Sequence, residues 1–220
     1  MIKAFIFDMD GVIIDSEPLH FQTDKMVLRD LGHDIADGEL SSFVGVTNPN
    51  MWAELIKRYK LDSTVEELLE LQSKYKNELF GQGELQAISG IPELIDDLKG
   101  RGIYIGLASS SSREFIEMVL KGLHIYHNFD VVISGEEVEN SKPAPDIFLK
   151  AAEVLKVAPA ECIVLEDSGN GVKAAKAAGM KCIAFKNPNS GNQDLTLADI
   201  TVGTLENLKY LDIQENGFKI

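Results

Sequence analysis

Cysteine and histidine are scarce in this chain of 220 residues. Its two cysteines, Cys162 and Cys182, both fall in runs that predict buried strands, so we expect two reduced thiols rather than a disulfide. The four histidines, at positions 20, 33, 124 and 127, show no spacing typical of a zinc site. A disulfide scaffold and a zinc protein are therefore both disfavoured.

Long hydrophobic runs and positive charge are also lacking. No stretch reaches the roughly 20 apolar residues that a membrane helix needs, and the apolar N-terminal run is broken at Asp8 without the shape of a signal peptide. We therefore expect a cytoplasmic protein with no membrane partner. Lysine and arginine number 21 against 35 aspartates and glutamates, and the net charge of −14 repels nucleic acid. No Gly-x-Gly-x-x-Gly follows the first predicted strand, which disfavours a nucleotide cofactor.

An acidic pair stands at the end of the first predicted strand. Asp8 and Asp10 directly follow the apolar run 2–7, and residues two apart on an extended segment point to the same side. Two carboxylates held so close repel unless a cation or a shared proton neutralises them, and Mg²⁺ prefers such oxygen ligands. One carboxylate can then attack phosphorus while the other transfers protons. The alternative is a simple Asp-Gly turn between two strands.

A serine-rich segment follows a second predicted strand, at the sheet edge where ligands bind in open parallel sheets. Ser109 closes the strand-like run 103–108, and a helix is expected to begin directly after it. Ser111 and Glu114 form the pattern of a capping box, and the free N–H groups of a helix start favour an anion. The alternative is a capped loop without a functional role.

Two more predicted strands end in charged residues. Lys142 lies among prolines after the run 130–134 and offers a fixed positive charge for phosphate. Glu166 and Asp167 follow the run 162–165 and add carboxylates to those of the first strand. A solvated lysine and an Asx-Gly turn are the alternatives, but they do not explain why each of these strands ends in a group suited to phosphate and magnesium.

Helices and strands alternate along the second half of the chain. Strand-like runs begin at residues 103, 130, 162 and 181, and predicted helices begin at 113, 146 and 172. Such alternation implies a parallel sheet covered by helices on both faces. The segment Asn187 to Asp194 is predicted as a polar loop. The fold class is therefore α/β, with a Rossmann-like doubly wound parallel sheet formed by residues 1–15 and 84–220.

A helical domain is predicted to interrupt this sheet after its first strand. Between residues 16 and 83 strand-like runs vanish, and Trp52 lies at helical spacing with other apolar residues, as is typical of a core position. Ser63 and Glu66 form a capping-box pattern at the start of another of its helices. We expect a small bundle with hinges near Asp15 and Gly83.

The acidic pair, serine, lysine and second acidic pair, in this order, resemble the haloacid dehalogenase superfamily, and more narrowly its β-phosphoglucomutase-like branch. The resemblance covers essentially the whole chain. It implies that Asp8 is the nucleophile and that Asp10 is the general acid and base. It also implies that Ser109, Ser110 and Lys142 bind the transferring phosphoryl group. A Mg²⁺ site would consist of Asp8, Asp10, Glu166 and Asp167, with Asp167 as a direct ligand.

The same resemblance identifies the inserted domain as a cap that closes on the substrate. By local context His20 and Lys76 match a histidine and a lysine that this branch uses at the substrate, although an ordinary helix residue and a solvated lysine are the alternatives. Thr47 and Asn48 lie in the turn where β-phosphoglucomutase carries an arginine that binds a second phosphate. Asn48 takes the place of the arginine, which disfavours a mutase.

We therefore expect a Mg²⁺-dependent phosphomonoesterase that acts on a small phosphorylated metabolite, a sugar or polyol phosphate, through an aspartyl-phosphate. β-Phosphoglucomutase is the alternative within the same branch. A non-enzymatic phosphorylation switch of the receiver type is the alternative from another class, although receivers are shorter and lack a cap. The expected assembly is a monomer or a weak homo-oligomer.

Overall fold

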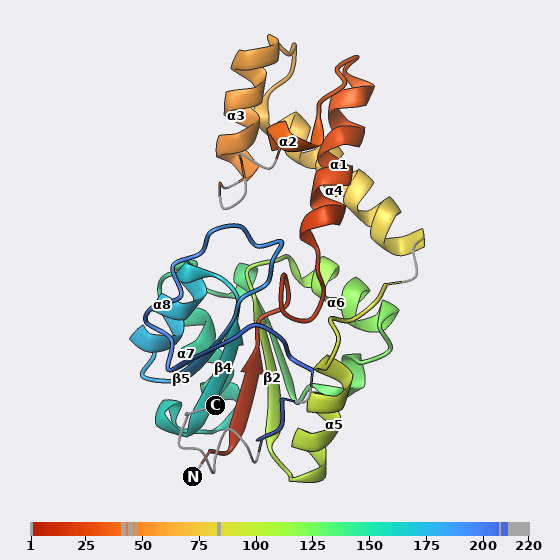
Figure 1. Cartoon of the computed structure of the whole chain (residues 1–220). Coiled ribbons are helices and arrows are strands. Elements are labelled where there is room, and N and C mark those ends of the chain that lie inside the picture. The colour runs from red at the N-terminus through yellow and green to blue at the C-terminus, as the bar shows by residue number, and fades with distance from the viewer. Residues whose placement is uncertain are drawn as a thin grey trace. The chain divides into compact units, whose positions relative to one another are not determined.

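The structure is a computed structural model that describes residues 2–40, 43, 46, 48–82, 85–206 and 208–210. The chain divides into two compact units (Figure 1): the larger comprises Met1–Asp15 and Leu85–Ile220, and the smaller comprises Ser16–Glu84. The second boundary expected from the sequence, at residues 83 and 84, lies outside the described residues. Each unit is therefore considered by itself.

The larger unit is built on a six-stranded sheet in the order β3-β2-β1-β4-β5-β6. All of its strand pairs are parallel, which confirms the predicted doubly wound sheet. The strands are β1 (Ala4–Phe7), β2 (Tyr104–Ser109), β3 (Val131–Ser134), β4 (Cys162–Glu166), β5 (Lys181–Phe185) and β6 (Ile200–Val202). The short edge strand β6 was not predicted from the sequence.

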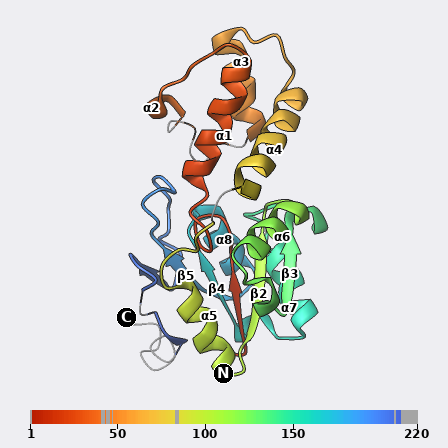
Figure 2. The ribbon, with the colours of Figure 1, turned by 90° about the vertical axis from the view of Figure 1, so that its right-hand side faces the viewer.

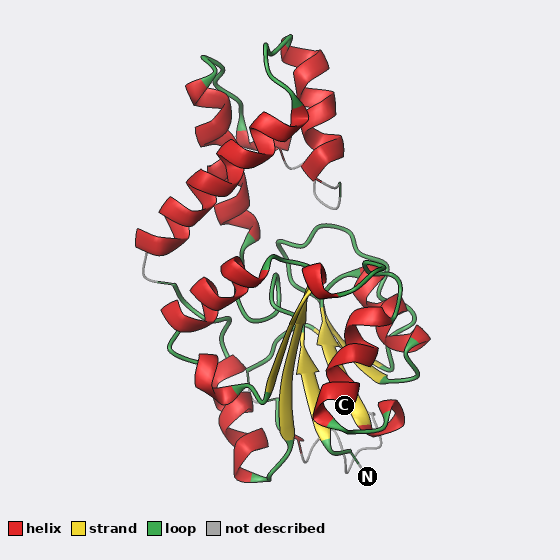
Figure 3. Ribbon diagram, turned by 180° about the vertical axis from the view of Figure 1, so that it is seen from behind, coloured by secondary structure: helices red, strands yellow, loops and turns green. Residues whose placement is uncertain are grey.

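Helices cover both faces of the sheet (Figures 2 and 3). They are α5 (Ile91–Gly100), α6 (Arg113–Gly122), α7 (Asp146–Leu155) and α8 (Gly169–Ala177). Helices α7 and α8 pack together against one face, where alternate residues of the strands, such as Ala4 and Ile6 of β1, join their hydrophobic core. All four residues of β1 are buried, as expected for a central parallel strand.

The strand register brings the ends of the three central strands to one level. Phe7 of β1 lies opposite Leu107 of β2 and Leu165 of β4. The backbone N–H of Asp8 continues this ladder by donating to the Leu165 carbonyl at 2.9 Å. Residues that immediately follow these positions are consequently neighbours, although they are far apart in the sequence.

The smaller unit is helical, as predicted for this part of the chain. It contains α1 (Glu17–Asp30), α2 (Asp37–Leu40), α3 (Asn48–Tyr59) and α4 (Val65–Gln82). Trp52 is fully buried in its hydrophobic core, together with Leu28 of α1, Leu55 of α3 and Leu68 of α4. The prediction of Trp52 as a core residue is therefore confirmed.

Helix α4 begins one residue later than the predicted capping box requires. The Thr64 hydroxyl accepts from the Glu67 N–H at 3.2 Å, and the Glu67 carboxylate accepts from the Thr64 N–H at 2.8 Å. The predicted pair Ser63 and Glu66 was wrong by one position, because two overlapping Ser/Thr-x-x-Glu patterns occur here and only Thr64 directly precedes Val65, the first residue of the helix.

The helix starts and the cysteines of the larger unit were also predicted from the sequence. Helix α7 begins at Asp146, as predicted, whereas α8 begins at Gly169, three residues earlier than expected. Cys162 and Cys182 are buried free thiols, as predicted. Within the described part of the chain, no helix combines the length and apolar character that crossing a membrane requires.

The capping geometry predicts different effects for two neighbouring hydroxyl deletions. Thr64→Ala should lower the free energy of unfolding by about 1 kcal/mol, because the Glu67 N–H loses its acceptor, whereas Ser63→Ala should change it by less than about 0.5 kcal/mol. Chemical denaturation followed by circular dichroism measures both. A larger loss for Ser63→Ala would show that the helix starts where the sequence pattern first suggested.

Candidate active site

One lysine connects the ends of three strands. The Lys142 Nζ donates to Asp8 Oδ1 at 2.6 Å, to Glu166 Oε1 at 2.8 Å and to the Ala108 carbonyl at 3.2 Å. Its ammonium protons thus have three acceptors, and its cation lies 4.8 Å from the centre of the Phe148 ring. Burial alone would lower the pKa of Lys142, but the charges of Asp8 and Glu166 outweigh it and raise this pKa, so the lysine stays protonated.

Glu166 has both carboxylate oxygens occupied by protein donors. Besides the bond from Lys142 to Oε1, the Oε2 atom accepts from the N–H groups of Asp167 and Ser168 at 2.8 and 2.7 Å, and from the Ser168 hydroxyl at 3.0 Å. Ser168 in turn caps helix α8 by accepting from the Gly171 N–H. A Cβ atom at Gly171 would lie 1.6 Å from Glu166 Oε1, so only glycine leaves room for this carboxylate.

A buried acid cluster lies beside the lysine. One carboxylate oxygen each from Asp8, Glu166 and Asp167 lies within 4.8 Å of the others. Burial raises the pKa of Asp8 well above its usual range despite the opposing charge of Lys142, and the charges of Glu166 and Asp167 raise it further. Burial, followed by the charge of Glu166, raises the pKa of Asp167 to about 7. Three carboxylates face one ammonium here, so a divalent cation would relieve their repulsion.

The Asp10 side chain contacts two serines, Ser109 and Ser111. Its Oδ2 atom accepts from the Ser111 hydroxyl at 2.8 Å and lies 3.5 Å from the Ser109 hydroxyl. The Ser111 N–H donates to Ser109 Oγ at 3.1 Å, which ties the two serines together. The carboxylate of Asp10 thus faces the end of β2, whereas the carboxylate of Asp8 faces Lys142.

Ser111 is a site residue that the sequence analysis assigned to another role. It does not cap α6; the cap is Ser112, whose hydroxyl accepts from the Phe115 N–H at 3.4 Å, so the predicted capping box was wrong. Ser111 lies two residues after Ser109, and this spacing on an extended segment could have indicated that both hydroxyls face Asp10. Ser110, between them, is exposed.

One of the expected cap residues, Asn48, is connected to Asp24 of the smaller unit through Gln72. The Asn48 side-chain N–H donates to Gln72 at 3.1 Å, and Gln72 donates to Asp24 at 2.5 Å. Burial raises the pKa of Asp24 to about 6, while the charges of His20 and Lys76 act to lower it. The sequence analysis missed Asp24 and Gln72, which occupy buried positions on their helices. Thr47 lies outside the described residues.

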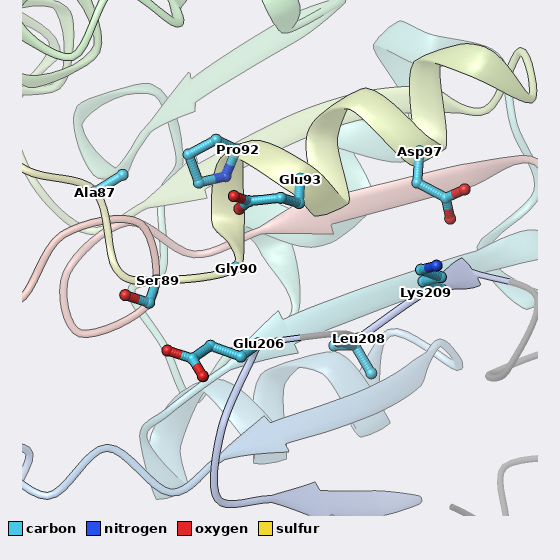
Figure 4. Close-up of a pocket in the computed structure, with 9 residues that line it drawn as sticks. All are labelled: Ala87, Ser89, Gly90, Pro92, Glu93, Asp97, Glu206, Leu208 and Lys209. Atoms are coloured by element: carbon cyan, nitrogen blue, oxygen red, sulfur yellow. The ribbon is translucent and has the colours of Figure 1, made fainter.

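The larger unit has two cavities of interest, and Asp167 of the acid cluster lines the smaller of them. The larger, of about 540 Å³, is lined by residues near the start of α5 and by the segment around Glu206 (Figure 4), and its lining includes no residue of the acid cluster. The smaller, of about 240 Å³, is lined by Asp167 and by residues of the loop after β5. The chemistry of the strand ends, rather than cavity size, therefore locates the candidate active site.

The chain is similar to known proteins over most of its length. Residues 5–185 match the model of a family described as haloacid dehalogenase-like hydrolase. Hexitol phosphatase B of Escherichia coli (strain K12) is 33% identical over 96% of both chains. The protein SUPPRESSOR OF QUENCHING 1, chloroplastic, of Arabidopsis thaliana is 35% identical over 84% of this chain, which spans only 18% of that protein.

Solved structures agree in fold. CbbY from Rhodobacter sphaeroides in complex with phosphate has a TM-score of 0.86 at 27% identity, over 97% of this chain and all of that one. β-Phosphoglucomutase from Clostridium difficile has a TM-score of 0.79 at 30% identity, over 98% of this chain and 96% of that one. The likeness thus extends over both units of the chain.

The raised pKa of Asp167 predicts how pH affects stability without metal. Because Asp167 resists ionisation in the folded state, wild-type protein loses stability as pH rises from the unfolded pKa of about 3.9 towards 7. Asp167→Asn cannot ionise and keeps an acceptor for its neighbours. In EDTA it should therefore exceed wild type in unfolding free energy by about 2–4 kcal/mol at pH 8, and by progressively less towards pH 5.

Denaturation curves from pH 5 to 8 measure this difference. The matched control is Asp194→Asn, since Asp194 is exposed and hydrogen bonds from Thr196 lower its pKa, so its substitution should bring no gain that grows with pH. A constant difference between Asp167→Asn and wild type over this range would contradict the prediction.

Proposed function

The chain belongs to the haloacid dehalogenase-like hydrolase family, and on this premise we propose that it is a Mg²⁺-dependent phosphomonoesterase of small phosphorylated metabolites. A sugar or polyol phosphate is the proposed substrate class, since a relative similar over nearly its whole length is named hexitol phosphatase. The observation that carries the proposal is the Asp8 carboxylate, held by Lys142 within the cluster of buried acids. Family membership also argues against the receiver-type switch, because the matched family is described as one of hydrolases.

We assign the attack on phosphorus to Asp8. Its Oδ1 atom is fixed by Lys142, and a carboxylate so oriented can attack in line with the ester bond. Attack forms a bond from Asp8 to phosphorus and breaks the bond from phosphorus to the ester oxygen. Lys142 offsets the repulsion between the carboxylate and the incoming phosphate, and Ser109 and Ser110 contribute donors to the phosphoryl oxygens.

Asp10 is the proposed proton carrier. In the first step it gives a proton to the oxygen of the leaving alcohol. In the second it takes a proton from a water molecule that attacks phosphorus, which breaks the bond to Asp8 and releases inorganic phosphate. The hydroxyl of Ser111, at 2.8 Å, orients the Asp10 carboxylate, whereas Asp8 is bound by Lys142, so we assign the two aspartates different tasks.

The residues present fit a Mg²⁺ ion. Asp8 and Asp167 would bind it directly, because each can offer an oxygen to the cluster, whereas both oxygens of Glu166 already accept from protein donors. Glu166 would then hold Lys142 and the start of α8 in place. The ion, when bound, neutralises charge on the carboxylates and on the phosphoryl oxygens.

The smaller unit is proposed to act as the cap. Among its residues His20, Asn48 and Lys76 are proposed to contact the part of the substrate remote from phosphorus. The hydrogen bonds that link Asn48 to Asp24 through Gln72, and the effect of the His20 and Lys76 charges on Asp24, support this proposal. A carboxylate and two amides recognise hydroxyl groups, which suits a polyol or a sugar.

β-Phosphoglucomutase is the second candidate, favoured by the 30% identity to the Clostridium difficile enzyme. A mutase must hold a bisphosphate by both ends, and its distal phosphate needs a directional cation such as a guanidinium. Asn48 is neutral, and one of its N–H groups is already donated to Gln72. We therefore favour hydrolysis.

Removal of the attacking charge tests the assignment of Asp8. Asp8→Asn should reduce turnover of phosphate esters to less than about 1% of wild type, because the amide keeps the shape but is not a nucleophile. The control Asp62→Asn makes the same chemical change at an exposed position and should keep full activity. Activity of Asp8→Asn well above this level, in protein with a wild-type melting curve, would reject Asp8 as the nucleophile.

The reaction product separates phosphatase from mutase. With β-glucose 1-phosphate, a trace of the bisphosphate and Mg²⁺, we expect free phosphate to accumulate and glucose 6-phosphate to remain scarce, because Asn48 cannot clamp a second phosphate. Both products are followed in the same sample, and excess EDTA should stop the reaction. Efficient formation of glucose 6-phosphate with little free phosphate would overturn the phosphatase assignment.

A further inference from the structure

The loop after β5 contacts one carboxylate of the acid cluster. The hydroxyl of Ser190, in this loop, donates to Asp167 Oδ2. Among the described residues, no hydrogen bond reaches the other oxygen, Oδ1. The hydroxyl therefore fixes the rotation of the carboxylate and leaves one oxygen available for a ligand.

A glycine lies against the same carboxylate oxygen. Gly11 follows the acidic pair of the first strand and has a left-handed backbone, with φ of +77°. A Cβ atom at this position would lie 2.0 Å from Asp167 Oδ2 and 3.0 Å from Ser190 Oγ. The Gly11 backbone and the Ser190 hydroxyl thus both lie against Asp167 Oδ2 and restrict the rotation of this carboxylate.

Hydrogen bonds fix the loop to both segments that carry the acid cluster. The buried Asn187 side chain donates to the Gly11 carbonyl at 2.9 Å. Gln193 donates to the Ser190 carbonyl at 2.8 Å and accepts from the Gly169 N–H at 3.1 Å. Ser190 therefore lies between two anchors, one to the turn after Asp10 and one to the start of α8.

We propose that Ser190 is a positioning residue for the metal site: its hydroxyl, on a loop anchored by Asn187 and Gln193, orients Asp167 so that Oδ1 is available to bind Mg²⁺. This inference rests on the proposed function, because it takes Asp167 as a metal ligand. It adds a residue of the loop after β5, which carries none of the four sequence motifs, to the groups that determine metal affinity.

The expected loss of Mg²⁺ affinity depends on what replaces the Ser190 hydroxyl. Loss of a group that orients a metal-binding side chain typically lowers metal affinity by about 10–100-fold. The cavity of about 240 Å³ that Asp167 lines has room for water, which can donate to Oδ2 in place of the serine. We therefore expect removal of the Ser190 hydroxyl to lower Mg²⁺ affinity by about 10-fold, near the lower end of this range.

The experiment measures Mg²⁺ binding to the full chain without substrate, by calorimetric titration after removal of metal with EDTA. Ser190→Ala should raise the dissociation constant about 10-fold, and Ser190→Thr, which keeps a hydroxyl, should restore most of the affinity. The matched control is Thr196→Ala, which removes a hydroxyl of the same loop that is bonded to Asp194 rather than to the acid cluster. The Mg²⁺ concentration for half-maximal phosphatase activity should shift in parallel, with little change in the rate at saturating Mg²⁺.

The outcomes separate this inference from the proposed function. Unchanged Mg²⁺ affinity in Ser190→Ala, with wild type binding normally, would overturn the role of Ser190 and leave the phosphatase assignment intact. Absence of saturable Mg²⁺ binding by wild type would overturn both. If Ser190→Ala does not fold, Gln193→Leu, which removes one anchor of the loop, should weaken Mg²⁺ binding in the same direction, and wild-type affinity in that variant would count against the proposal.

Discussion

The arrangement of the site depends on one buried ammonium group. Lys142 binds Asp8 after β1, the Ala108 carbonyl in β2 and Glu166 at the end of β4. Without this cation two buried carboxylates would lose their common partner, and an unpaired buried charge costs several kcal/mol. Lys142 comes from the segment between β3 and α7, outside the three strands that it connects. The ion pairs therefore hold together parts of the chain that the backbone ladder alone does not align.

The two neighbouring acids after β4 differ in what surrounds them. Glu166 is saturated by Lys142 and by donors at the start of α8, and Gly171 leaves the space that it fills. Asp167 has one oxygen held by Ser190 and no described donor to the other. Adjacent residues of the same charge thus carry out separate tasks, one in fixing the lysine and one in offering an oxygen to a ligand.

Much of the fold and of the site could be predicted, because parallel strands align their carboxyl ends and the two acidic pairs and Ser109 lie at the ends of apolar runs. Asp8, Ser109 and Glu166 come together for this reason, whereas Lys142 reaches Asp8 and Glu166 from the segment between β3 and α7. The exact helix starts could not be predicted, since overlapping patterns such as Ser63-x-x-Glu66 and Thr64-x-x-Glu67 differ only in register. Ser190 and Asn187 escaped prediction because their roles depend on where a polar loop crosses the sheet edge, which no local periodicity encodes.

Because β1 lies in the middle of the sheet, it pairs with strands that are synthesised after it. Its partner strands β2 and β4 are synthesised much later, and Asp8 lies 134 residues before Lys142. The smaller unit, by contrast, is one continuous segment with largely helical, short-range contacts, which form quickly. A chain leaving the ribosome can therefore complete this helical unit first. The first strand must wait with one edge unpaired until β2 has emerged, and with the other edge unpaired until β4 has emerged.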